Sequence, residues 1–421
     1  MRWASLAVAG VLLILRLGIH PAVASPNPML HAASDAVVDA HGDRVLLRCV
    51  NLSPWLVPEG YLMAGGSLAA LTTSPSQIKE RLAAVVGPER AAAFWRQWIE
   101  AFVSEADFRQ LRAAGFNCVR LPLDANFIAS RTDDDHVAFV PDMMRPVDDA
   151  VAWGAAAGIY VVLDLHDAPG GQNSLSTASD VPSRDHTPRL WQGAGAADNQ
   201  RKTALLWRAL AARYANARSV GGYDLLNEPA LPRGAPDDEL AHFYRAMIAA
   251  VRSADPDHMI VIEGNNYAHD FSTLQTLRDG NILYEFHEYA LANRRWRRPG
   301  EAQLEPFLQL RRATGRPLWL GEFGENTAAW QARVVGLLEP HDIGWAIWPW
   351  KRVALSAENP VIETIEAPSS WRELADYLVG RWLARKPSSA TAERAMEDML
   401  VAVRTANCRT DQSLESILAG K

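Results

Sequence analysis

The chain has 421 residues, of which 48% are hydrophobic, so it can bury one large core or two of ordinary size. Its 42 basic and 49 acidic residues give a formal net charge of -7, which is mild for this length. Because the sequence has no basic stripe, we expect no nucleic-acid partner. It also has no acidic tail of the kind that predicts a disordered arm.

The N-terminal residues have the pattern of an export signal. Arg2 gives a positive start, an apolar run spans Ala4 to Leu15, and Ala22-Val23-Ala24 is a small-residue cleavage pattern. We therefore predict a signal peptide over residues 1–24 and a secreted or periplasmic protein without membrane contact after cleavage. The run is short for a membrane-spanning helix, which needs about 20 apolar residues, and an uncleaved anchor is the alternative interpretation.

Eight apolar runs then alternate with helical patterns, after a predicted hairpin that turns at His41-Gly42. The runs lack strict alternation, as is typical of strands covered on both faces in a parallel sheet. The predicted strands are Leu46–Leu52, Asn117–Leu121, Ile159–Leu165, Gly222–Leu226, Met259–Glu263, Ile282–His287, Leu318–Gly321 and Ile343–Trp348.

Helices are predicted between these strands. Ser104-x-x-Asp107 indicates a capping box at the start of a helix that ends near Gly115. Longer helices are predicted over Asn199–Arg218, Asp237–Ala254 and Glu301–Thr314. Eight β–α units in series predict an α/β fold, a (β/α)8 TIM barrel, as one domain over residues 25–390. The alternative is an open doubly wound sheet, whose usual G-x-G-x-x-G is missing after the first strand.

Three long connections follow predicted strands, at residues 53–103, 167–197 and 352–370. They should lie on the C-terminal face of the barrel, where such folds build their active sites. Residues 391–421 are predicted to form a C-terminal helix and tail that pack outside the barrel. No stretch has the pattern of a separate carbohydrate-binding module.

Three cysteines, Cys49, Cys118 and Cys408, occur without a C-x-x-C pair, so no zinc or redox motif follows. Cys49 and Cys118 fall within two predicted neighbouring strands. We expect two buried thiols that act as small hydrophobic side chains, in preference to a disulfide.

Two glutamates lie at the ends of predicted strands. Glu228 in Asn227-Glu228-Pro229 follows the fourth strand, and Glu322 follows the seventh. A carboxylate directly after a buried strand is costly unless it faces a polar cavity. A protonated and an ionised carboxyl group at one end of a barrel can together cleave a glycosidic bond. For either glutamate alone, a salt bridge is the alternative interpretation.

With their neighbours, these motifs resemble glycoside hydrolase family 5, the cellulase-like family, over roughly residues 37–385. The resemblance implies that Glu228 is the catalytic acid/base and Glu322 the nucleophile of a retaining β-glycosidase. It also implies substrate-binding roles for Arg120, His166, Asn227, His287, Tyr289 and Trp348. It implies no cofactor and no metal ion.

The implied roles have a physical basis. Arg120 can keep the nucleophile ionised, because an adjacent guanidinium lowers a carboxyl pKa. Asn227 can hydrogen-bond the sugar 2-hydroxyl, and Tyr289 can hydrogen-bond Glu322. The structural alternatives are an ion pair for Arg120, a turn for Asn227 and a core position for Tyr289.

The remaining residues would contact the sugar itself. His166 and His287 can donate to hydroxyl groups or orient the glutamates, and Trp348 can form a platform at the cleavage point. A core position is the alternative for each. For a retaining pair we expect carboxyl groups about 5–5.5 Å apart, with Arg120 nearer Glu322 and the higher pKa on Glu228.

A narrower similarity lies in Asp164–Asn173, which resembles the D-L-H-x-A-P-G-x-Q-N segment of the exo-β-1,3-glucanase-like branch of that family. Trp55-Leu56-Val57-Pro58-Glu59 resembles the same branch. These segments imply β-1,3-linked or short β-glucosides as substrates in preference to crystalline cellulose, with β-1,4-glucan and other β-glucosides still open. Asp167 departs from the branch pattern, and it could narrow the site or contact substrate.

Other enzyme classes lack support in the sequence. His287-Glu288 begins like the zinc motif H-E-x-x-H, but Leu291 breaks it, and G-x-S-x-G is absent. Two alternatives stay open, a transglycosylase on the same scaffold and a catalytically silent glycan-binding barrel. We expect a monomer whose partner is a β-glucan oligosaccharide or polysaccharide.

Overall fold

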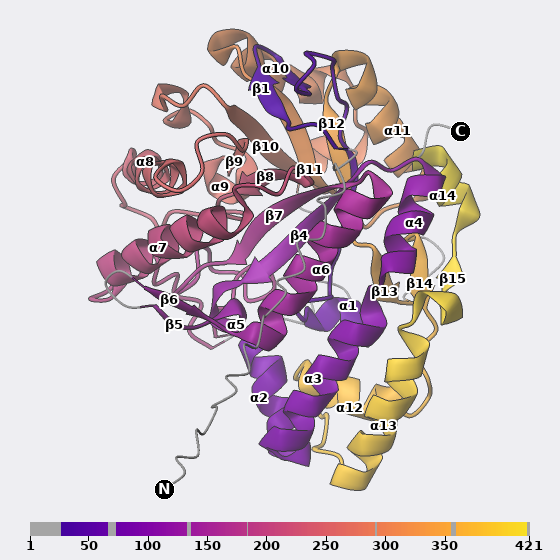
Figure 1. Ribbon diagram of the computed structural model, residues 1–421. Coiled ribbons are helices and arrows are strands. Elements are labelled where there is room, and N and C mark those ends of the chain that lie inside the picture. Colours follow the sequence, from indigo (N-terminus) through magenta and orange to yellow (C-terminus); the bar gives the residue numbers. More distant parts are fainter. Residues whose placement is uncertain are drawn as a thin grey trace, which may run out of the picture.

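The computed structural model describes residues 27–65, 73–132, 136–182, 184–290, 293–354 and 359–418, so the predicted signal peptide lies outside the described residues. All eight predicted strands form one closed barrel of parallel strands (Figure 1). Around the barrel these are β3 Arg48–Asn51, β4 Cys118–Asp124, β7 Tyr160–Asp167, β8 Val220–Asp224, β9 Ile260–Glu263, β10 Ile282–Glu288, β11 Leu318–Gly324 and β12 Gly344–Trp348. The predicted (β/α)8 barrel is confirmed.

The connecting helices cover the outside of the barrel (Figure 1). They are α4 Glu105–Ala114, α6 Pro141–Ala157, α7 Ala196–Tyr214, α8 Glu239–Arg252, α10 Glu301–Thr314 and α11 Ala328–Leu338. Every residue of β4 and β7 to β12 is buried, which explains why the strands are apolar without alternation. The connection from β9 to β10 departs from the pattern, because it contains only the short α9 Asn265–Ala268 and a 3-10 turn, Leu274–Thr276.

Local signals set the limits of α4 as predicted. The backbone N–H of Ser104 donates to the Asp107 carboxylate at 2.7 Å, which satisfies a free group at the helix start. The helix ends at Gly115, whose φ of 108° lies in the left-handed region that glycine tolerates.

The long connections on the C-terminal face contain structure of their own. The first holds α1 Gly60–Ala64, α2 Pro75–Val86 and α3 Pro88–Phe102, and the connection after β4 holds α5 Ala125–Ile128, β5 Ala129–Thr132 and β6 Val137–Phe139. The connection after β12 holds β13 Lys351–Val353 and β14 Glu363–Ile365.

The C-terminal segment packs beside the first of these connections (Figure 1). It comprises α12 Trp371–Leu378, α13 Ser389–Ala402, β15 Arg409–Thr410 and α14 Gln412–Leu418. Helix α13 contacts α2, α3 and α12, and β15 pairs with β14. Buried Lys351 on β13 joins the segment to the connection after β12, because it donates to the carbonyl of Val403 at 3.1 Å and to Thr405 Oγ1 at 2.6 Å.

The chain before the barrel forms a hairpin that was not predicted. Strands β1 His31–Ala33 and β2 Ala36–Val38 pair antiparallel. The predicted turn at His41-Gly42 is present, but only the single bridge between Val38 and Arg44 follows it. None of the helices within the described ranges has the length and apolar character needed to span a bilayer.

The expectation of two free thiols at Cys49 and Cys118 is wrong. These residues are register partners on β3 and β4, their Cα atoms are 4.3 Å apart, and they form a disulfide. Barrel closure places two strands side by side although their cysteines are 69 residues apart in sequence. Cys408 is a free, half-buried cysteine.

Candidate active site

A cavity of about 800 Å³ lies at the C-terminal ends of the barrel strands. Seven of the eight predicted site residues line it, which are His166, Asn227, Glu228, His287, Tyr289, Glu322 and Trp348. The eighth, Arg120, is fully buried and contacts Glu322. The barrel therefore brings together all the side chains that the sequence placed at strand ends.

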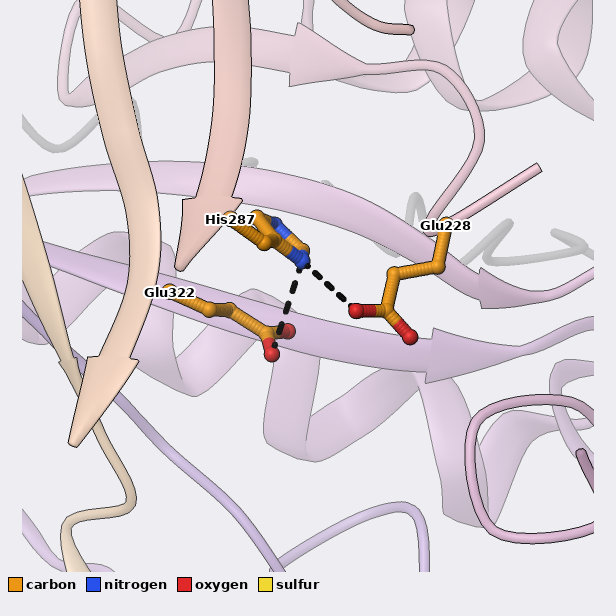
Figure 2. A group of neighbouring side chains, drawn as sticks. All are labelled: Glu228, His287 and Glu322. Carbon is orange, nitrogen blue, oxygen red and sulfur yellow. Dashed lines mark hydrogen bonds and ion pairs between the residues drawn. The ribbon is translucent and has the colours of Figure 1, made fainter. Parts of the chain in front are cut away.

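Glu228 and Glu322 face each other across this cavity. Figure 2 shows both carboxylates directed towards the ring of His287, Glu322 from β11 and Glu228 from the loop after β8. Nδ1 of His287 lies 3.1 Å from Oε1 of Glu228 and 3.6 Å from Oε2 of Glu322. A carboxylate oxygen of each glutamate and a ring nitrogen of His287 lie within 4.8 Å of one another.

Two donors hold the Glu322 carboxylate. Nη1 of Arg120 lies 2.8 Å from Oε1, and the hydroxyl of Tyr289 donates to Oε2 at 2.8 Å. Each oxygen therefore has its own partner, which fixes the plane of the carboxylate towards the cavity. Arg120 lies beside Glu322, as expected.

Hydrogen bonds to its backbone N–H and carbonyl groups hold Glu228 in place. Its N–H donates to Oε2 of Glu263 at 2.7 Å, and its carbonyl accepts from Nδ2 of Asn173 at 3.0 Å. Its φ of 44° is uncommon for a residue with a side chain, so the surrounding contacts must hold this conformation. Burial raises the pKa of Glu228 above its usual value, which favours a carboxyl group that carries a proton near working pH.

Arg120 lies at the centre of a buried carboxylate cluster that the sequence analysis missed. Its guanidinium contacts five carboxylates at 2.7–3.1 Å, those of Asp164, Asp224, Glu263, Glu285 and Glu322. The first four come from β7, β8, β9 and β10 and are completely buried. The sequence signal that could have indicated this cluster is one acidic residue inside each of four consecutive apolar strands.

One guanidinium cannot neutralise five carboxylates, so the cluster must hold protons. Burial raises the pKa of Asp164 and that of Asp224 to about 7, and the Arg120 charge only partly opposes this. Burial also raises the pKa of Glu285 well above its usual range. Gly321 makes room for the cluster, because a Cβ there would lie 1.4 Å from Oε1 of Glu285.

The raised pKa of Asp224 predicts how stability depends on pH. The folded protein holds a proton on Asp224 up to about pH 7, whereas an unfolded aspartate loses it near pH 4. This stabilising contribution is complete below about pH 4 and is lost as pH rises to 7, by up to about 1.4 kcal/mol per pH unit. Asp224→Asn removes the contribution, so the unfolding free energy of wild type minus that of the variant should fall over this range.

Urea denaturation of both proteins at several pH values from 4 to 8 measures this difference. The comparison cancels the opposing contribution of His166 and His287, which both proteins share. A difference that stays constant with pH would contradict a proton on Asp224.

The two histidines of the site are neutral at ordinary pH. Burial lowers the pKa of His166 to about 4 and that of His287 to about 3. The His166 ring stacks on Trp348, with ring centroids 5.4 Å apart and planes 5° apart. Trp348 Nε1 donates to the Tyr61 hydroxyl at 2.7 Å, so this aromatic wall is fixed from behind.

Asn227 has one free donor at the cavity. Its Oδ1 accepts from Nη2 of Arg120 at 3.0 Å, whereas its buried Nδ2 has no hydrogen-bond partner among the described residues. Buried polar groups are nearly always paired. The unpaired Nδ2 of Asn227 is therefore available to a substrate hydroxyl.

The cavity wall also contains residues that were not predicted as site residues, among them Glu59, Tyr61 and Glu325. Glu59 and Tyr61 come from the first long connection, and Glu325 follows β11. Burial raises the pKa of Glu59 well above its usual range, and the Ser53 hydroxyl donates to it at 2.5 Å. The Trp55–Glu59 motif could have indicated this wall. Asp167, which could have narrowed the site or contacted substrate, is buried and is not among the residues that line the cavity.

Two sets of side chains could in principle hold a metal ion. Donor atoms lie within 4.8 Å of one another in the set Glu228, His287 and Glu322, and in the set Glu263, Glu285 and His287. Arg120 lies 3.0 Å from Glu263 and 3.1 Å from Glu285, so a cation in the second set would be next to a guanidinium. The contacts favour a hydrogen-bonded network in both sets.

Comparison with known proteins gives the geometry a family context. A β-xylosidase from Phanerodontia chrysosporium is 31% identical over 312 residues, which are 70% of this chain and 61% of that protein. A probable glucan 1,3-beta-glucosidase A from Aspergillus fumigatus is 30% identical over 283 residues, 67% of this chain and 63% of that protein. The chain thus spans less than two thirds of the length of these curated relatives.

A solved structure shares the fold. The crystal structure of endogalactoceramidase aligns with a TM-score of 0.57 and 23% identity, covering 77% of this chain and 75% of that one. The family model for cellulase, glycosyl hydrolase family 5, matches residues 82–353. This range is more than half of the chain and includes Arg120, Glu228 and Glu322. The chain belongs to the cellulase family, glycosyl hydrolase family 5.

Proposed function

We propose that this protein is a retaining glycosidase that hydrolyses β-glucosidic bonds through a covalent glycosyl-enzyme. One observation carries the proposal, the approach of Glu228 and Glu322 oxygens to within 4.8 Å across the cavity. Carboxyl groups of retaining enzymes lie about 5–5.5 Å apart, whereas inverting pairs lie about 6.5–9.5 Å apart to admit a water. The observed approach favours direct attack on the anomeric carbon.

The reaction proceeds in two displacements. Glu228 donates its proton to the glycosidic oxygen while Glu322 attacks the anomeric carbon, so the leaving group departs as a neutral alcohol. Glu228, now ionised, takes a proton from water, and the water oxygen displaces Glu322 from the sugar. Both carboxyl groups return to their starting states, and two inversions give net retention.

The neighbouring residues support these steps. Arg120 and Tyr289 position Glu322 through their hydrogen bonds to its two oxygens. Asn227 Nδ2 donates to the sugar 2-hydroxyl, a contact that strengthens as positive charge develops on the ring. His166 and His287 bind sugar hydroxyls as neutral imidazoles, and Trp348 supplies the aromatic wall.

For the substrate we propose β-1,3-linked or short β-glucosides. The Asp164–Asn173 segment and the name of the Aspergillus fumigatus relative support this class. The β-xylosidase relative makes xylosides the necessary comparison. Hydrolysis of only mannan or xylan would contradict the substrate assignment.

We also propose that residues 1–24 direct export, and that residues 25–390 form the catalytic domain with 391–421 as its C-terminal extension.

Proton NMR of the first sugar released from an aryl β-glucoside tests the mechanism. We expect the β-anomer to appear first and then to mutarotate, because two displacements restore the starting configuration. The same sugar in buffer without enzyme gives the rate of mutarotation. Initial release of the α-anomer would mean inversion and would remove Glu322 as nucleophile. Absence of any turnover would favour a silent glycan-binding barrel, and disaccharide products would favour a transglycosylase.

A further inference from the structure

The loop after β9 contains a left-handed turn of three residues with side chains. Asn266, Tyr267 and Ala268 have φ values of 56°, 58° and 63°. Residues other than glycine seldom adopt this conformation, and then usually singly, because Cβ approaches the carbonyl oxygen. Strain of this kind persists only where the surroundings impose it, and it concentrates at functional sites.

Specific contacts hold this turn. The two backbone hydrogen bonds between Asn265 and Asp270, both 2.8 Å, close the loop at its base. Gly264 allows the closure, since a Cβ there would lie 2.8 Å from the Asp270 nitrogen. The backbone N–H of Tyr267 donates to the carbonyl of Pro229 at 3.1 Å, so the turn is fixed beside the residue that follows Glu228.

This turn places the Tyr267 side chain at the wall of the cavity. Tyr267 lines the cavity, and its hydroxyl lies 3.5 Å from Oγ of Ser174 in the loop after β7. That separation is too long for a strong hydrogen bond, so the hydroxyl can turn to another acceptor. Burial raises the pKa of Tyr267, which keeps the hydroxyl protonated and able to donate.

The cavity wall differs between its two glutamates. Near Glu322, the hydroxyl of Tyr289 bonds the carboxylate and Trp348 pairs with Gly324 on β11. Near Glu228, the chain is joined to the turn that carries Tyr267. In the proposed reaction the proton donor lies next to the leaving-group oxygen, whereas the nucleophile lies below the sugar that it attacks. Tyr267 is therefore on the leaving-group side.

We propose that Tyr267 is a specificity-determining residue that binds the leaving group, and that this leaving group is a sugar. A half-buried tyrosine ring offers a flat face to the C–H face of a pyranose, and its hydroxyl donates to a sugar oxygen. A bare hydrocarbon chain would contact the ring but would offer the hydroxyl no hydrogen-bond acceptor. The inference rests on the proposed glycosidase function and adds the identity of the group that departs.

The test compares two kinds of substrate in the Tyr267→Asn variant. Asparagine tolerates the left-handed conformation better than most residues, so the turn is kept while the ring is lost. We expect kcat/KM on laminaribiose or cellobiose to fall roughly 10- to 100-fold, because stacking and a hydrogen bond are lost. On 2,4-dinitrophenyl β-glucoside kcat/KM should stay within about twofold, since this leaving group needs little stabilisation. Tyr267→Phe should give an intermediate loss on the disaccharides only.

Ala268→Gly is the matched control, because it lies in the same turn but is buried away from the cavity. Its kcat/KM should match wild type on both substrates. Equal losses on both substrates in Tyr267→Asn, or no loss on either, would overturn the inference. So would a wild-type protein that cleaves the aryl glucoside but neither disaccharide. Wild-type protein inactive on every β-glycoside would instead refute the proposed function itself.

Discussion

Replacing Glu322 with alanine should lower kcat on an aryl β-glucoside by about 10⁴-fold or more, because the covalent intermediate cannot form. Arg120 and Tyr289 each lie 2.8 Å from the Glu322 carboxylate, which fixes its position in the cavity, and alanine leaves that position empty. Added azide should occupy the vacated space and restore turnover. Since only one displacement then remains, the product should be the α-glycosyl azide, which NMR identifies.

Glu228→Ala provides the matched control for this experiment. With an activated leaving group the glycosyl-enzyme still forms on Glu322, and azide then attacks it, which gives the β-glycosyl azide. The two variants should therefore yield azides of opposite configuration. Unimpaired hydrolysis by Glu322→Ala, or the same anomer from both variants, would refute the assigned roles.

Replacing Arg120 with methionine should lower the free energy of unfolding by about 3–5 kcal/mol at neutral pH, because it removes the cation from a buried carboxylate cluster. Arg120 is completely buried and contacts five carboxylates. The same substitution should abolish activity, since Glu322 loses one of its two donors. Urea denaturation monitored by tryptophan fluorescence measures the change in stability.

Acidity should rescue part of this loss. The pKa values of Asp164 and Asp224 are already raised to about 7, so these two groups take up protons below that pH and the cluster then carries less negative charge. The stability gap between wild type and Arg120→Met should therefore be smaller at pH 5 than at pH 8. Arg145→Met is the control, because Arg145 forms exposed ion pairs with Glu100 and Asp149 that contribute at most about 1 kcal/mol. Similar losses in both variants would contradict the role of the cluster.

The sequence by itself determined the barrel and the candidate catalytic pair. Apolar runs, caps and glycine stops depend on neighbours a few residues apart, so the strands and the limits of α4 are readable without tertiary contacts. A polar residue at the end of a buried strand is equally local. This signal located Glu228 and Glu322, the family resemblance added the residues around them, and closure of the barrel brought them to one cavity.

Only the tertiary structure decided which distant residues meet. The register of β3 against β4 pairs Cys49 with Cys118, and periodicity within either strand carries no information about that pairing. The acidic residues around Arg120 look unrelated in sequence, because each belongs to a different strand. They contact Arg120 together only after the strands close into a barrel. The left-handed turn that carries Tyr267 is likewise decided by contacts between residues that are distant in sequence. Its intrinsic preference opposes the conformation, and contacts with the neighbouring loop impose it.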